Sequence, residues 1–115
     1  MGRVTVQLDG WEHECCGDRR RVGDTVTLSV AYHDGHWFEQ RHDYGNGMSQ
    51  RRVSGRLVAI GWRPAILRHV TDVAQEVEGY GPAVLLQSTE ERPAGDCWAF
   101  DFEVETDGLP PEAGR

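Results

Sequence analysis

Hydrophobic and polar residues alternate in three segments of the chain, which is the spacing of a β-strand with one buried face. The segments are residues 4–8 (VTVQL), 25–32 (TVTLSVAY) and 98–105 (WAFDFEVE). In the last segment three aromatic residues and a valine face one way and three carboxylates face the other, which is typical of an antiparallel strand with one wet face. Turn signals, Asp9-Gly10 and Gly23-Asp24, lie beside the first two segments. We therefore predict three amphipathic strands.

Three other apolar segments depart from this pattern. Residues 53–62 are rich in β-branched and aliphatic side chains and include Gly55 and Gly61, which predicts a bent or bulged strand such as a small barrel needs at its corners. Residues 84–87 (VLLQ) predict a short buried strand. Residues 64–78 have apolar positions at helical spacing but many β-branched side chains, so a short helix and a strand are equal alternatives there.

Residues 33–50 contain two turn signals, Asp34-Gly35 and Gly45-Asn46-Gly47. We therefore predict a long irregular loop between the strands on either side. Loops of this length often carry function.

Short strands separated by turns, without alternating helices, predict a mainly β protein. Its architecture is either a small antiparallel barrel of the SH3-like or OB-like kind or a two-layer sandwich. A chain of 115 residues suits one domain, which we assign to residues 1–106, and residues 107–115 are expected to form a flexible tail. The predicted core consists of Val4, Val6, Leu8, Val26, Leu28, Val30, Trp98, Phe100 and Phe102.

The chain carries 19 acidic and 12 basic residues, a formal net charge of −7 at pH 7. This balance opposes non-specific binding to nucleic acid and to anionic membranes, because both bind proteins through neutralised phosphates. Residues 83–86 (AVLL) form the longest purely apolar run, which is too short to span a bilayer, and the first residues lack the apolar stretch of a signal peptide. We therefore expect a cytoplasmic protein that does not associate with membranes.

A zinc site is one interpretation of the cysteines and histidines. His13 and Cys15 project from the same side if residues 11–15 are extended, and Zn²⁺ accepts mixed Cys and His ligands. Cys16 follows directly, and the 33–50 loop could bring His36 and His42 to the same place. The spacing matches no paired metal-binding frame. The alternative is that the cysteines are small buried hydrophobic residues and the histidines are solvated.

A reactive thiol is a further interpretation of the same segment. Arg19, Arg20 and Arg21 follow Cys16, and nearby cations favour the thiolate form. Such a thiol would also need a histidine base within hydrogen-bond reach. The sequence contains no recognised catalytic motif, so we expect no enzymatic activity, with a metal- or thiol-dependent protein as the alternative.

Two basic clusters are candidate binding surfaces for a partner. They are Arg19, Arg20 and Arg21 before the second strand, and Arg51, Arg52 and Arg56 in the first part of the bent strand, with Trp37 and Phe38 in the loop offering stacking surface. If they share one face, they could hold single-stranded nucleic acid. The net charge opposes this, so we expect a protein partner and keep nucleic acid as the second alternative.

The segment Trp11–Gly17 (WEHECCG), followed by residues 22–26 (VGDTV), resembles a family of small uncharacterised proteins from GC-rich bacteria. The pattern is W-x-x-x-C-C-G and then V-G-D-x-V, and the resemblance extends to residues 53–58 and 100–104. The family tends to have Pro-Phe where this chain has Arg19-Arg20, and two adjacent histidines where it has only His42. The resemblance implies cytoplasmic residence and no particular activity.

These observations together predict a small non-catalytic binding or accessory module. Its functional edge is expected at the Cys15–Cys16 turn and the 33–50 loop.

Overall fold

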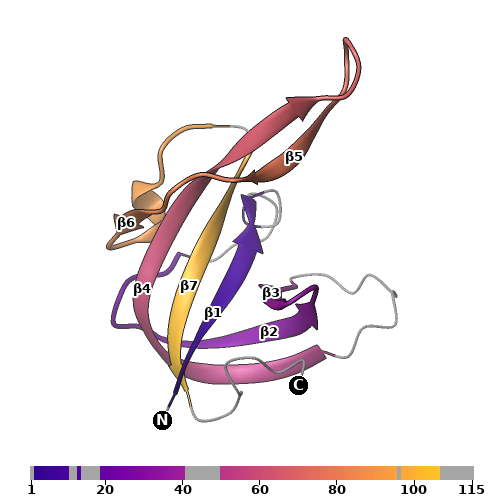
Figure 1. Ribbon diagram of the computed structural model, residues 1–115. Helices are drawn as coiled ribbons and strands as arrows, with labels where there is room; N and C mark the ends of the chain where they lie inside the picture. Colours follow the sequence, from indigo (N-terminus) through magenta and orange to yellow (C-terminus); the bar gives the residue numbers. More distant parts are fainter. Residues whose placement is uncertain (1, 11–12, 14–18, 41–49, 96, 107–115) are drawn as a thin grey trace.

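The computed structural model describes residues 2–10, 13, 19–40, 50–95 and 97–106. These residues form a seven-stranded sheet and one short 3-10 turn (Figure 1). The elements are β1 (Gly2–Asp9), β2 (Thr25–His33), β3 (His36–Glu39), β4 (Gln50–His69), β5 (Gln75–Tyr80), β6 (Val84–Leu86), η1 (Thr89–Glu91) and β7 (Trp98–Thr106). None of the described residues belongs to a helix with the length and hydropathy needed to cross a membrane.

Five of the strands close into a small barrel. Their order is β2-β3-β1-β7-β4, and pairing between β4 and β2 completes the ring. The mainly β class and the barrel alternative are therefore confirmed. One contact differs from the expected antiparallel arrangement, because β1 and β3 run parallel, with Val6 opposite Trp37. A closed ring of five strands cannot be antiparallel at every contact, and because the other four contacts are antiparallel, the contact between β3 and β1 is parallel.

That hairpin corrects the prediction of an irregular loop over residues 33–50. Asp34 and Gly35 both have positive φ, 50° and 84°, as a two-residue hairpin turn requires. The four residues after the turn form β3, in which Trp37 and Glu39 are buried. Residues 41–49 of the predicted loop lie outside the described residues.

The bent strand predicted over residues 53–62 is part of β4, which pairs with β2 in its first part and with β7 further along. The two pairings overlap at Arg56, which lies opposite both Thr25 and Glu105. A side chain at Gly55 would collide with the backbone carbonyl of Glu105. Glycine therefore permits the close approach at this corner, as predicted.

The helix alternative for residues 64–78 is wrong and the strand alternative is confirmed. β4 continues past its last pairing with β7 at Pro64, turns back, and returns as β5, with Leu67 opposite Val77. At the turn, the Thr71 hydroxyl accepts hydrogen bonds from the backbone N–H groups of Val73 (3.3 Å) and Ala74 (3.0 Å). We call residues 65–80 the arm, because they project beyond the barrel (Figure 1).

The core fills the barrel interior, and every predicted core residue except the partly buried Val26 belongs to it. The predicted buried strand at 84–87 is β6, but Val84 and Leu85 are exposed and only Leu86 is buried. Among the described strands, β6 pairs with β4 alone and lies outside the ring, so it contributes little to the interior. The buried hydrophobic cluster is Val4, Val6, Leu8, Leu28, Val30, Trp37, Val53, Leu57, Ile60, Leu86, Trp98, Phe100, Phe102 and Val104.

Candidate binding site at the base of the arm

The residues predicted to bind zinc are only partly within the described chain. The ring of His13 packs edge-on against Trp98 and Phe100, with centroids 5.8 and 5.1 Å away. His36 is exposed on β3 beside Phe38, 6.2 Å between ring centroids. No group of three or more metal-ligating side chains occurs among the residues that the structure describes. Cys15, Cys16 and His42 lie outside them, so the zinc site stays a prediction.

The first basic cluster is divided between the interior and the surface. Arg20 is buried and donates two hydrogen bonds to the carboxylate of Glu39, at 2.6 and 2.7 Å. Its guanidinium also lies 4.9 Å from the ring centroid of Phe102. Arg19 is exposed and paired with Glu90, and Arg21 is exposed. The expectation that Arg20 lies on a partner surface is therefore wrong, because it belongs to a buried ion pair.

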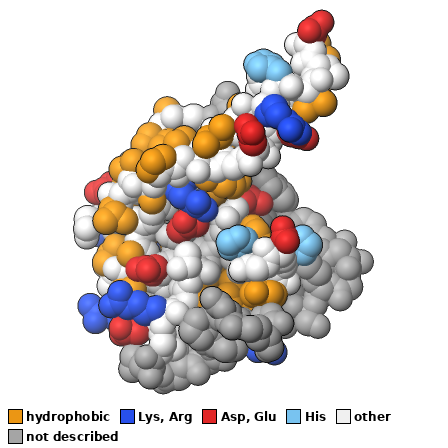
Figure 2. Space-filling model, in the orientation of Figure 1, with side chains coloured by type: hydrophobic (Ala, Val, Ile, Leu, Met, Phe, Trp, Pro, Cys, Tyr) orange, Lys and Arg blue, Asp and Glu red, His pale blue; other side chains and the backbone are white. Residues whose placement is uncertain are grey.

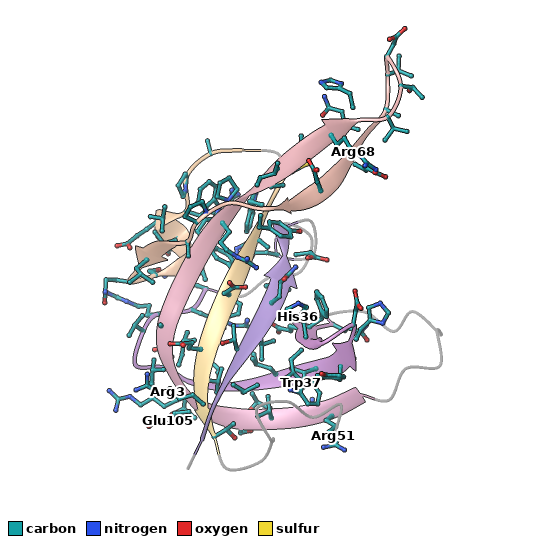
Figure 3. The ribbon with its side chains drawn as sticks, in the orientation of Figure 1. Arg3, His36, Trp37, Arg51, Arg68 and Glu105 are labelled. Atoms are coloured by element: carbon teal, nitrogen blue, oxygen red, sulfur yellow. The ribbon has the colours of Figure 1, made fainter. Side chains whose placement is uncertain are left out.

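The aromatic residues expected beside the basic clusters differ in exposure. Trp37 is only 4% exposed and packs against Tyr32, so it offers no stacking surface. Phe38 is half-buried. Figure 3 shows Trp37 between β2 and β3, whereas Arg51 points away from the barrel. Arg52 is also exposed.

The two basic clusters do not lie together. Arg21 comes before the start of β2 at Thr25, whereas Arg51 pairs opposite Val30 towards the other end. Five strand residues at about 3.3 Å each separate Thr25 from Val30, roughly 16 Å. Arg56, exposed on β4 opposite Thr25, is the β4 arginine nearest the first cluster, whereas Arg51 and Arg52 lie towards the other end of β2.

A polar hollow of about 320 Å³ lies next to the first cluster. Both of its arginines are already engaged, Arg20 by Glu39 and Arg19 by Glu90. The lining residues are Arg19, Arg20, Asp24, Thr25, Val26 and Thr27.

A second hollow, which we call the notch, lies where the arm leaves the barrel, and has a volume of about 260 Å³. Its wall is mostly apolar with a polar rim, which is typical of a small binding site. A side chain at Gly10 would meet the Trp98 ring at 2.8 Å, so glycine allows the indole to pack against the backbone there. The lining residues are Asp9, Gly10, Ala65, Val77, Tyr80, Cys97 and Trp98.

Backbone hydrogen bonds join the base of the arm to the neighbouring segments. The N–H of Ala65 donates to the carbonyl of Cys97 at 3.1 Å, and the N–H of Gly81 donates to the carbonyl of Pro64 at 2.8 Å. Both bonds lie beside the notch. The start of the arm is therefore anchored to the barrel, although its tip projects away.

A polar network lies on the barrel face next to the notch. Arg63 forms an ion pair with Asp101 (Nε to Oδ2, 2.9 Å) and donates a hydrogen bond to its Oδ1 at 3.2 Å. The same guanidinium lies 5.1 Å from the ring centroid of Tyr80. Gln7 donates to Asp9 at 3.0 Å. The network joins β1, β4, β5 and β7, so it fixes the orientation of the arm base.

Burial shifts two groups of this network. It raises the pKa of the Asp101 carboxyl, and the positive charge of Arg63 opposes the shift. Burial also raises the pKa of the Tyr80 phenol, the negative charge of Asp9 raises it further, and Arg63 lowers it. Both groups therefore lie in partly desolvated surroundings, where polar interactions are stronger than in water.

We predict that Tyr80 ionises above the ordinary tyrosine pKa of about 10. The chain has three tyrosines, so the absorbance of the phenolate is followed in the wild-type chain and in Tyr80→Phe, and the difference is assigned to Tyr80. Asp9→Asn should lower the pKa of Tyr80 by removing a negative charge. Glu103→Gln, on the barrel face of β7, is the matched control. Ionisation of Tyr80 at or below pH 10 would contradict the burial.

The sign of the linked stability follows from this shift. The unfolded chain loses the phenol proton at a lower pH than the folded chain does. The free energy of unfolding contributed by Tyr80 therefore falls as the pH rises above about 10.

The arm could not be recognised as a surface from the sequence, in which its aliphatic residues have the spacing of a possible helical face. In a helix they would be buried on one side. In the two-stranded arm they are exposed instead, and Val73 at the tip is 96% exposed. The exposed large hydrophobic residues of the arm are Ile66, Leu67, Val70, Val73 and Val77.

Comparison with protein-family models, with curated proteins and with solved structures gives no match. The resemblance to the uncharacterised bacterial family stays a prediction. The function is therefore inferred from the geometry of the molecule.

Proposed function

We propose that this protein is a small non-catalytic protein-binding module, and that the arm with the notch at its base is the binding element. The observation that carries the proposal is the exposure of the aliphatic side chains of the arm. Leu67 and Val77 are 42% and 47% exposed although they face each other across two strands. Apolar side chains gathered in this way on a surface are typical of an interaction site.

The shape of the arm supports the same proposal. A two-stranded ribbon is marginally stable by itself in water, because neither of its faces is covered. Figure 2 shows the arm clear of the body of the molecule, with basic, acidic and histidine side chains along it. A partner that covers one face would bury apolar surface that the barrel leaves exposed.

The polar groups near the notch are paired with one another. The carboxylate of Asp101 is held by Arg63, and the carboxylate of Asp9 accepts a hydrogen bond from Gln7. These contacts hold the rim of the notch in one arrangement, which suits a preformed binding surface.

The arm differs from the functional edge that the sequence predicts. That edge consists of the Cys15–Cys16 turn, which lies outside the described residues, and residues 33–50. Of the latter, residues 36–39 are a barrel strand with two buried side chains. The arm offers more exposed apolar surface than β3 does.

The test compares the proteins captured by variants of the chain from a lysate of its source cells. The arm variant is Leu67→Ser with Val77→Ser. The matched control is Val84→Ser with Leu85→Ser, which changes two exposed aliphatic residues on β6, outside the arm. We expect the wild-type chain and the control to capture at least one protein that the arm variant does not retain.

Circular dichroism melting checks that both variants keep the barrel. Val73→Ser, at the arm tip, gives a second arm variant without a cross-strand partner to disturb. The same captured proteins for the wild-type chain and both arm variants, or none for any of them, would contradict the proposal.

A further inference from the structure

β5 has one edge that no other described strand pairs with. It is the last strand of the sheet order, and β4 is its single partner in the described chain. Residues 75–78 of β5 are all exposed, and because the register with β4 shifts at Glu78, the regular part of this edge is residues 75–77. The N–H and C=O groups along such an edge are a template for an added strand.

The charge of the arm is unbalanced. Its acidic residues are Asp72, Glu76 and Glu78, and its single arginine, Arg68, is already ion-paired with Glu76. Arg68 lies along the arm in Figure 3. The whole chain also carries a net charge of −7. A segment that pairs with β5 would therefore meet a negative surface, which favours a basic partner.

A second copy of the chain fits the middle of this edge poorly. Symmetric antiparallel pairing of two β5 strands must place one residue opposite itself. Centring on residue 77 puts Glu76 of each copy opposite Glu78 of the other, and centring on 76 or 78 puts a glutamate opposite its own copy. Like charges directly opposite each other destabilise a strand pair.

One face of the arm is apolar and the other is charged, and this difference predicts which side chains a partner strand would present to each face. Val77 and Tyr80 of β5 face the notch, and Leu67 lies opposite Val77 on the same face. Arg68 and Glu76 form a cross-strand pair on the opposite face. An added strand presents alternate side chains to these two faces. Apolar side chains would therefore lie beside the notch, and basic side chains beside Glu76.

We infer that the arm binds an extended peptide segment in which basic and apolar residues alternate, and that this segment adds as a strand to the free edge of β5. The inference rests on the proposed function for the location of the binding element. It adds the chemical class of the partner and the way in which the partner binds.

The probe is a short fluorescein-labelled peptide of alternating arginine and valine, and its anisotropy is measured as the chain is added. We expect saturable binding that weakens with added salt. A peptide of alternating glutamate and valine should not bind. The arginine peptide with N-methylated backbone amides should also fail to bind, because it keeps the charges but lacks the donors for strand pairing.

Variants of the chain test the location. Glu76→Gln with Glu78→Gln should weaken binding about fivefold, as expected for two exposed charges. The matched control is Glu103→Gln with Glu105→Gln, which removes the same charge from β7 and should leave the affinity unchanged. Equal weakening by both pairs, or equal binding of the methylated peptide, would overturn the inference.

Sedimentation of the chain alone tests whether a second copy of the chain occupies the edge of β5. A monomer is expected. A dimer that dissociates in the Leu67→Ser, Val77→Ser variant would assign the edge of β5 to a second copy. It would overturn the inference that this edge binds a peptide. If protein capture depends on the arm but the arginine peptide does not bind, the inference fails and the proposed function stands. If capture does not depend on the arm, the proposed function itself fails.

Discussion

Replacing Glu39 with alanine is expected to lower the free energy of unfolding by about 3–5 kcal/mol, as removal of one partner from a buried ion pair does. Arg20 and Glu39 are 5% and 2% exposed, and two short hydrogen bonds join them. The alanine variant leaves a buried guanidinium without this carboxylate. Denaturation by urea, monitored by tryptophan fluorescence, measures the change.

Two further variants distinguish the buried pair from ordinary surface pairing. Arg19→Ala breaks the exposed ion pair with Glu90 and should cost less than about 1 kcal/mol. Arg20→Met with Glu39→Leu replaces both charges with apolar side chains, and should restore much of the stability lost in Glu39→Ala. A cost for Glu39→Ala no larger than that of Arg19→Ala would show that the pair is not buried.

The Arg20–Glu39 pair is also part of the contacts that attach the segment before β2 to the barrel. The backbone N–H of Arg20 donates to the Thr89 hydroxyl, and the backbone N–H of Thr89 donates to the carbonyl of Arg20, at 3.0 and 2.9 Å. The arginine side chain then reaches Glu39 on β3 and lies over Phe102 on β7. One residue thus joins η1, β3 and β7.

Replacing Phe100 with alanine is expected to cost about 3–5 kcal/mol, because a large buried aromatic side chain leaves a cavity when it is truncated. Phe100 is fully buried. Its ring centroid lies 4.9 Å from that of Trp98 and 5.4 Å from that of Phe102. The midpoint of thermal or urea denaturation should fall accordingly.

Leu85→Ala is the control for this prediction, since Leu85 is 76% exposed on β6. A surface substitution of this kind should change stability by no more than about 0.5 kcal/mol. If the two variants melted together, Phe100 would not be part of the core that supports β7.

These two predictions bear on the binding element as well as on stability. β7 pairs with β4 up to Pro64, where the arm begins, and Trp98 of β7 lines the notch. The aromatic packing of Phe100 against Trp98 therefore supports the base of the arm.

The period-2 pattern in the sequence was sufficient to locate β1, β2 and β7, because one face of each strand is buried and the other is wet. The bent strand was also visible, because Gly55 marks the close approach of two backbones at the corner of the barrel. The helix alternative at residues 64–78 arose because exposed aliphatic residues in a hairpin can match helical spacing. Their sequence pattern does not reveal which face, if any, will be covered.

The candidate site could not be predicted from the sequence. Asp9, Arg63, Tyr80 and Asp101 belong to four strands, and no spacing along the chain brings them together. Likewise, Arg20 sits in a run of three arginines that is indistinguishable from a solvated basic cluster. Nothing in the sequence around Glu39 identifies it as the partner of Arg20.

The sequence by itself determined that this chain forms amphipathic strands, which residues of those strands enter the core, and where the chain can bend. These properties depend on the local alternation of side chains and on glycine, so they can be seen in short segments. The tertiary structure alone decided the closure of the barrel, the burial of Arg20 with Glu39 and the projection of the arm. Each of these depends on which distant strands pair, and pairing sets the burial and electrostatic surroundings that give a residue its role.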